Sequence, residues 1–364
     1  MNTRQYFIPY FSLLILPFVF VILTLTPVYA SCGSASCFLA IGNQPSVQPK
    51  GTLRADFNYS YVPQKGPQNR VAAVDVGTKT IINNEHKEFQ TINQQLKLNL
   101  NYGVTDYFTL QLTIPVVSRE HDHQIEVGIA PEGGPDGGKG TFENFDTTSL
   151  GDIQLMAKYA FLPSLRSLVV IGAGVSFPTG NFEARNSEGT VQEPSLQVGR
   201  GDYGAIGQIF QSYEIIPHKL NQFFSYTYNH TFENKFNYQF GDTHIVTGGL
   251  SYNVTPAINI SSQVNWTYKV QDSYKSKLTQ AGAIGPGLGA EPVVLDGNIK
   301  TRGVGNTGST NLMFTPGITV SFTDSTSWYF YSQVPLVQDY NGGLEQGVSF
   351  LTGFVKFFNV GTSS

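Results

Sequence analysis

The sequence predicts an all-β protein, a single antiparallel transmembrane β-barrel of about twelve strands. Three observations predict this fold: long segments in which apolar and polar residues alternate, connections that alternate between short and long, and a secretory leader with no later apolar run of 18 residues. Alternation with a period of two places successive side chains on opposite faces of a strand. One face can then meet lipid while the other meets a water-filled lumen.

The clearest alternation lies in a pair of segments, Ile92–Tyr102 and Phe108–Val117, joined by a tight turn. Each segment is long for a globular strand but suits a tilted membrane crossing. A first strand over 53–61 precedes this pair. The remaining predicted strands cover residues 153–161, 168–177, 203–213, 224–232, 246–254, 258–268, 312–322, 328–337 and 348–358. The barrel therefore spans 51–358, followed by a C-terminal tail over 359–364.

The connections between these strands differ in length in a regular order. Short connections fall at 103–106, 163–166, 215–221, 255–257 and 323–325, and longer ones at 62–87, 119–148, 178–200, 233–241, 271–309 and 338–346. Short periplasmic turns and long extracellular loops are typical of barrels in the outer membrane of Gram-negative bacteria, which is the predicted location. Loop 271–309 is the longest and a candidate plug. A soluble β-sandwich or solenoid is the alternative, although its strands would be shorter.

Residues 1–30 are predicted to be a signal peptide. A thin positive region with Arg4 precedes the apolar stretch 7–25, and Val28–Ala30 forms a small-residue cleavage site. A retained membrane anchor and a lipidated cysteine remain alternatives. Segment 31–50 is then a periplasmic N-terminal segment with both cysteines of the chain, Cys32 and Cys37, for which a small disulfide loop is predicted. A metal or redox role for the pair is the alternative.

The composition excludes several classes of function. Charged residues make up 13% of the chain, about half the usual share of a soluble domain. The net charge is −4 and no long basic run exists, which argues against binding of nucleic acid. Glycine, tyrosine, phenylalanine and small polar residues take the place of the missing charges. This balance suits a barrel whose lipid face needs an apolar residue only at every second position.

The tracts Leu150–Tyr159 and Gly172–Gly180, together with the turn Gly103–Asp106, carry a resemblance to a known family. They resemble the transporter-like outer-membrane family labelled "MetA-pathway of phenol degradation". The resemblance covers most of the chain after the leader. It implies an outer-membrane channel for aromatic or other small organic compounds, and it implies no catalytic residues.

The polar faces of the strands are predicted to line the lumen. These predicted lumen residues are Arg54, Asp56, Asn58, Asn93, Gln95, Lys97, Asn99, Gln111, Asn229, Gln263 and Asn265. Charged members are few and of both signs, and pore selectivity follows the lining charge. The sequence therefore predicts a weak ion preference and passage of neutral polar or aromatic solutes.

No pattern in the chain predicts an enzyme, a cofactor or a metal site. The densest set of metal-ligating residues, His121–His123, lacks a nearby Glu or Cys partner and is predicted to be a solvated loop. No P-loop, nucleophile motif or carboxylate pair is present.

The sequence thus predicts a passive channel whose partners are outer-membrane lipid and small solutes. A structural sheath for a periplasmic or extracellular partner, such as an electron-carrying cytochrome, is the alternative, in which Cys32 and Cys37 would form a docking element. Binding of a periplasmic partner and homo-oligomerisation remain open.

Overall fold

The structure is a computed structural model of the whole chain. The residues it describes are 47–66, 74–76, 79–81, 86–125, 141–185, 194–279, 294–303, 307–340 and 344–361. The predicted signal peptide and the cysteines Cys32 and Cys37 lie outside these residues, as does the middle of the loop predicted as a plug.

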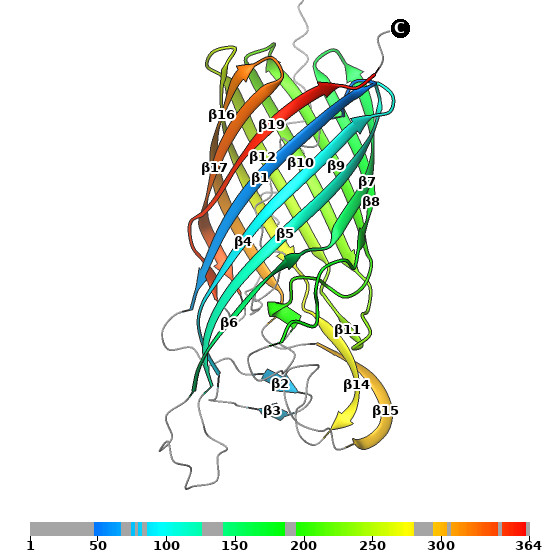
Figure 1. Cartoon of the computed structure of the whole chain (residues 1–364), viewed down its shortest axis with the longest axis vertical. Coiled ribbons are helices and arrows are strands. Elements are labelled where there is room, and N and C mark those ends of the chain that lie inside the picture. Colours follow the sequence, from blue (N-terminus) through cyan, green and yellow to red (C-terminus); the bar gives the residue numbers. More distant parts are fainter. Residues whose placement is uncertain are drawn as a thin grey trace, which may run out of the picture.

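Twelve long strands form the wall of a closed antiparallel barrel (Figure 1). They are β1 (Thr52–Lys65), β4 (His86–Gly103), β5 (Phe108–Ile125), β7 (Ile153–Ser164), β8 (Ser167–Phe177), β9 (Gly204–Ile216), β10 (Leu220–Thr231), β12 (Thr243–Asn253), β13 (Ile258–Lys269), β16 (Ser309–Thr323), β17 (Thr326–Asp339) and β19 (Ser349–Asn359). Each strand pairs with its neighbours in chain order, and β1 pairs with both β4 and β19. This last pairing closes the ring, so no edge of the wall is left unpaired.

Shorter elements gather at the end of the barrel that carries the long loops (lower end in Figure 1). They are β2 (Val74–Val76), β3 (Lys79–Ile81), β6 (Thr141–Leu150), the 3₁₀ turn η1 (Pro194–Leu196), β11 (Tyr238–Gln239), β14 (Ser273–Thr279), β15 (Val294–Gly303) and β18 (Glu345–Gln346). Gly51 and Gly361 are hydrogen-bonded to each other at the opposite end, beside the short turns. We call this the periplasmic end and the other the extracellular end, following the polarity of bacterial barrels. Within the described residues, no helix is long and apolar enough to cross a membrane.

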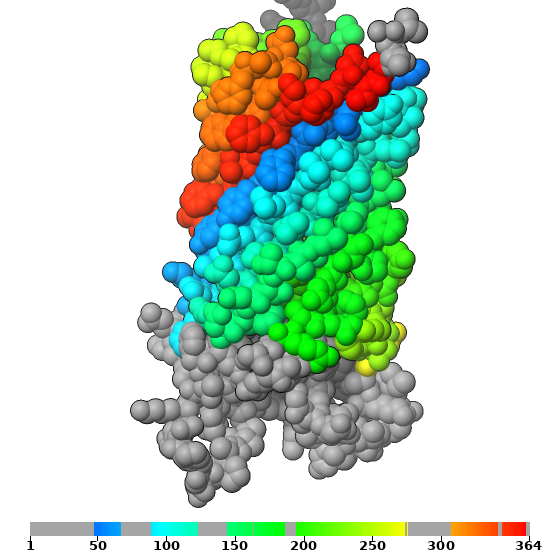
Figure 2. Space-filling view, viewed as in Figure 1, coloured from blue at the N-terminus to red at the C-terminus, as the bar shows by residue number. Residues whose placement is uncertain are grey.

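The two faces of the wall differ as the alternation predicts. On β1, Phe57 is 52% exposed while its neighbour Asp56 is fully buried. Leu96 and Leu110, on β4 and β5, also lie on the exposed outer face. Figure 2 shows that β1, β4 and β5 form one continuous, tilted part of this outer surface. Large apolar side chains on the outside are stable only against lipid, so the fold is that of an outer-membrane barrel.

We expect an arginine on this outer face to destabilise the barrel. Replacing Leu96 in the middle of β4 with arginine should lower the free energy of unfolding by about 2–4 kcal/mol, because the charge would lie in hydrocarbon. Leu165→Arg is the matched control, since Leu165 is fully exposed in a periplasmic turn and should cost about 0–1 kcal/mol. Guanidinium unfolding in liposomes measures both values. Equal costs for the two variants would contradict the assignment of the lipid face.

The prediction of a loop over 119–148 is wrong in part. β5 continues to Ile125 and pairs with β6, so a hairpin extends the wall at the extracellular end. This extension lies beyond the apolar band, and a hydrogen-bonded ladder there needs no apolar face. His121 is accordingly a buried strand residue whose ring nitrogen is hydrogen-bonded to Thr91, rather than part of a solvated loop. The same reason explains β14 and β15, which lie within the predicted loop 271–309.

Candidate solute pathway

The structure brings the predicted lumen residues to the inner side of one ring. Those that are buried are Arg54, Asp56, Asn58, Asn93, Gln95, Asn99, Gln263 and Asn265. Lys97, Gln111 and Asn229 are half-buried on the same inner side. Their strand neighbours, such as Leu96 and Val264, are exposed on the outer surface. The inner wall therefore carries a polar lining in which backbone parity alone fixes the orientation.

Hydrogen bonds between neighbouring strands hold this lining in place. On one side of the barrel the Thr113 hydroxyl donates to Asn99 Oδ1 at 2.9 Å. On the other side Asn265 accepts from Thr247 at 2.8 Å and donates to Thr315 at 2.8 Å. Amides and hydroxyls that bind one another in this way present a fixed surface to whatever passes through the lumen.

An ion pair lies near the periplasmic end of the lumen. Arg54 Nη2 and Asp56 Oδ2 are 2.9 Å apart on β1, and both side chains are buried. The Tyr329 hydroxyl donates to Asp56 at 2.8 Å from β17. Asp56 is therefore fully engaged by groups of the wall. Tyr329 is thus a lumen residue. Its position near the end of a strand alone would have predicted an aromatic membrane anchor instead.

A short segment before β1, Val47–Lys50, narrows the periplasmic end; we call it the N-terminal strap. Val47 packs against a buried apolar cluster of inward-facing residues, which consists of Ala160, Val170, Phe210 and Phe223. The backbone amide of Gln48, a residue only 3% exposed, donates to Thr109 Oγ1 at 2.8 Å. The strap therefore lies inside the wall, where a solute leaving the lumen has to pass.

Gly103, the last residue of β4, gives the strap its room. A Cβ atom at this position would lie 2.1 Å from the carbonyl oxygen of Pro49 and 2.5 Å from that of Gln48. Real Cβ atoms do not approach backbone oxygens so closely, so any larger residue must displace the strap. Gly51 N also donates to Gly103 O at 2.8 Å, which fixes the strap to the wall.

The connection between β8 and β9, which we call the β8–β9 loop, narrows the extracellular end. Arg119 of β5 is 1% exposed and points toward this loop. Its Nε donates to Asn93 Oδ1 at 2.8 Å, and its Nη1 donates to the carbonyl of Gln197 at 3.2 Å and to that of Ser195. Leu196 packs with the inward-facing Phe145 and with Ala184. One arginine of the wall therefore holds the loop across the mouth.

Asp152, in the connection between β6 and β7, fastens the same loop at its two ends. Its carboxylate accepts from the amide of Gly180 at 3.0 Å and from the amide of Arg200 at 3.0 Å. Burial raises the pKa of the Asp152 carboxyl, and these two amides and the Arg200 charge oppose that shift. The two amides thus stabilise the ionised carboxylate of Asp152, which is the form that binds the loop.

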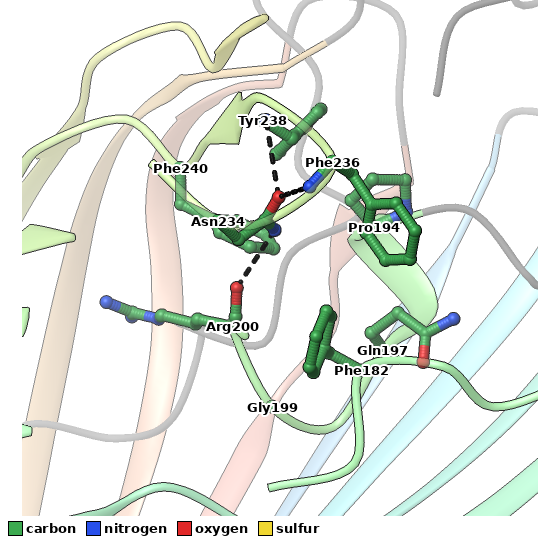
Figure 3. A pocket seen from close by; sticks show the side chains of 9 residues that line it. All are labelled: Phe182, Pro194, Gln197, Gly199, Arg200, Asn234, Phe236, Tyr238 and Phe240. Carbon is green, nitrogen blue, oxygen red and sulfur yellow. Dashed lines mark hydrogen bonds between the residues drawn. The ribbon is translucent and has the colours of Figure 1, made fainter. Parts of the chain in front are cut away.

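Beside this loop lies an aromatic cleft, which we call the vestibule (Figure 3). The hollow between its lining residues has room for about one water molecule and is otherwise open to solvent. Its lining residues are Phe182, Pro194, Gln197, Gly199, Arg200, Asn234, Phe236, Tyr238 and Phe240. Phe182 and Phe236 meet edge to face, with ring centroids 5.6 Å apart. Asn234 holds the two loops together, since it donates to Arg200 O and accepts from the amides of Phe236 and Tyr238.

Two lysines border the vestibule. The Lys235 ammonium lies 5.1 Å from the Phe182 ring and 5.3 Å from the Phe236 ring. Lys269 lies 5.8 Å from the Phe240 ring and is paired with Asp272 at 2.8 Å. The lysines thus lie against the aromatic rings, where cation–π contacts stabilise the loops of the extracellular mouth. Among the described residues, no group of three His, Cys, Asp or Glu side chains could hold a metal ion.

Sequence reasoning missed the strap, Arg119 and the vestibule. The phenylalanines of the vestibule lie in segments that read as polar loops. Arg119 marked the predicted start of a loop, although it continues the parity of Thr113 and Val117 and thus faces inward. That parity is the signal that could have found it.

The closed ring, the polar inner lining and the apolar outer face define an outer-membrane β-barrel. The chain belongs to the family described as "Putative MetA-pathway of phenol degradation", whose model matches residues 43–334. The resemblance drawn from the sequence motifs is thereby confirmed.

Solved structures of outer-membrane barrels are similar, and one of them supports the same fold. An outer membrane channel from Pseudomonas putida F1 is similar with a TM-score of 0.53 at 12% identity, over 88% of this chain and 100% of that one. The Ralstonia pickettii toluene transporter TbuX is more distant, with a TM-score of 0.41 at 9% identity, over 86% of this chain and 90% of that one. No curated protein matches the sequence.

Proposed function

We propose that the protein is a passive outer-membrane channel for small solutes, aromatic compounds among them. The observation that carries the proposal is the polar lining of a closed barrel, with aromatic residues gathered at its extracellular mouth. Membership of the phenol-degradation family and the likeness to an outer membrane channel support it. The lumen residues predicted from the sequence then serve as the hydrophilic surface along which solutes move.

The pathway has three parts in this proposal. Aromatic solutes first meet the ring faces and cations of the vestibule, where stacking and cation–π contacts hold them weakly. They then pass the polar lining, which exchanges hydrogen bonds with hydroxyl groups without binding them tightly. The N-terminal strap is the last barrier before the periplasm. Passive flux requires weak binding at each step.

Liposome swelling tests the proposal. Proteoliposomes should swell in arabinose and in the phenolic glycoside arbutin, both of which cross lipid slowly, and should swell more slowly in the trisaccharide raffinose. Liposomes without protein provide the baseline. Swelling no faster than this baseline in every solute would refute the channel. The sheath alternative predicts instead that the purified protein carries haem absorbance from a partner, whereas a plain channel is colourless.

A further inference from the structure

Two lysines of the lumen stand apart from its other cations. Lys97 of β4 and Lys158 of β7 face inward, and Lys158 is only 3% exposed. Neither makes a hydrogen bond or an ion pair with any residue that the structure describes. Arg54 and Lys269, by contrast, are each paired with a carboxylate of the wall. Because neither ammonium is paired with a carboxylate of the wall, the charge of each remains available to a solute in the lumen.

Positive charges outnumber negative charges near these two lysines. Asp56 attracts Lys97, and Arg54 repels Lys158. The carboxylate of Asp56 is already taken by Arg54, Asn58 and Tyr329. Three cations therefore share one carboxylate, and the uncompensated charge of this part of the lumen is positive. The mixed signs of the predicted lumen residues predict a weak ion preference. Asp56 is the one acidic residue among them, however, and its charge is balanced by Arg54.

Lys158 also lies where the pathway is narrowed. Its strand partner across the β5–β7 pair is Thr109, whose hydroxyl binds the amide of Gln48 in the N-terminal strap. On its other side its stem lies over Gly172, where an added Cβ would be 3.6 Å from Lys158 Cγ. A solute that leaves through the periplasmic end thus passes this ammonium at the strap.

We propose that Lys97 and Lys158 make this lumen selective for anions and that the preferred solutes are small carboxylates, aromatic acids in particular. The inference rests on the proposed channel function. An ammonium offers three donors and a full charge to a carboxylate, and a narrow lumen strengthens that attraction relative to bulk water.

Reversal potentials across planar bilayers test the charge selectivity. In a KCl gradient the wild-type channel should pass chloride over potassium by at least fivefold, because one unit charge at about 4 Å in water favours an anion over a neutral solute by about that factor and disfavours a cation as well. Lys97→Gln with Lys158→Gln should bring this ratio close to one, and each single variant should give an intermediate ratio. Lys356→Gln is the matched control, because Lys356 lies on the outer surface of β19 and should leave the ratio unchanged. A wild-type ratio near one, or a double variant as anion-selective as wild type, would overturn the proposal.

A second readout separates this inference from the channel function itself. Benzoate should reduce the chloride current at concentrations at least fivefold lower than its neutral analogue benzyl alcohol, and the double variant should lose this difference. If no current flows, the proposed channel function fails. Equilibrium binding to the detergent-solubilised protein then tests the lysines separately. Benzoate binding that depends on Lys158 supports the site, and equal affinity for benzoate and benzyl alcohol overturns it.

Discussion

Gly103→Ala should open the periplasmic end of the barrel and increase the single-channel conductance severalfold. The new Cβ would overlap the carbonyl oxygens of Pro49 and Gln48, at 2.1 and 2.5 Å. The wall at this point belongs to the hydrogen-bonded ladder of the barrel, whereas the strap lies outside that ladder. The strap should therefore leave the lumen rather than the strand distort. Planar-bilayer recording measures the conductance, and cleavage by an added protease near residues 47–50 reports the position of the strap.

Gly248→Ala is the matched control for this experiment. Gly248 lies in β12, and an added Cβ there would meet nothing within 4 Å. The two variants add the same methyl group to the same kind of strand backbone, so a difference between them reflects the strap alone. The unfolding midpoint of Gly248→Ala should stay the same or rise by the equivalent of about 1 kcal/mol or less, because alanine restricts the unfolded chain more than glycine does. Wild-type conductance and protease resistance in Gly103→Ala would show that the strap does not close the pathway.

The barrel wall could be predicted from the sequence because lipid imposes a simple rule. Every second residue must be apolar over a length of chain set by the membrane, and every strand must be paired. Leu96, Leu98 and Leu100 against Lys97 and Asn99 express this rule without exception. The twelve predicted strands all lie within the twelve observed ones or differ from them by a few residues at an end. The parity of the strands also identified the inward-facing residues.

The rule fails where lipid ends. β6 and the outer half of β5 form a regular ladder, but their side chains carry no period of apolar residues, and so they read as loop. The two constrictions, the N-terminal strap and the β8–β9 loop, are harder still to predict, because they depend on contacts between residues far apart in the chain. Val47 packs against the cluster that contains Phe210 and Phe223, and Arg119 is hydrogen-bonded to Gln197. Nothing local in these segments records that pairing. The charge balance of the lumen could not be predicted for the same reason, because it depends on the pairing of Asp56 with Arg54.

Arg119→Ala should release the β8–β9 loop from the extracellular mouth and raise the single-channel conductance. Two hydrogen bonds from the guanidinium to loop carbonyls would be lost. Hydrogen bonds of charged groups contribute about 1.5–3 kcal/mol each, so even one lost bond shifts the balance between the closed and open loop by roughly tenfold or more. Asp152 would still hold the two ends of the loop, so the part that should leave the mouth is its middle, where only the contact of Leu196 with Phe145 remains.

The design separates loop release from unfolding of the barrel. Arg119→Lys keeps the charge but reaches fewer carbonyls, so its conductance should lie between those of wild type and Arg119→Ala. Arg166→Ala, at an exposed periplasmic turn, removes an arginine without touching the loop and should conduct as wild type does. Retained heat-modifiable migration in gels confirms that each barrel is folded. If folded Arg119→Ala barrels conduct no better than wild type, the loop does not limit the flux, and the narrow point lies at the strap and Lys158 instead.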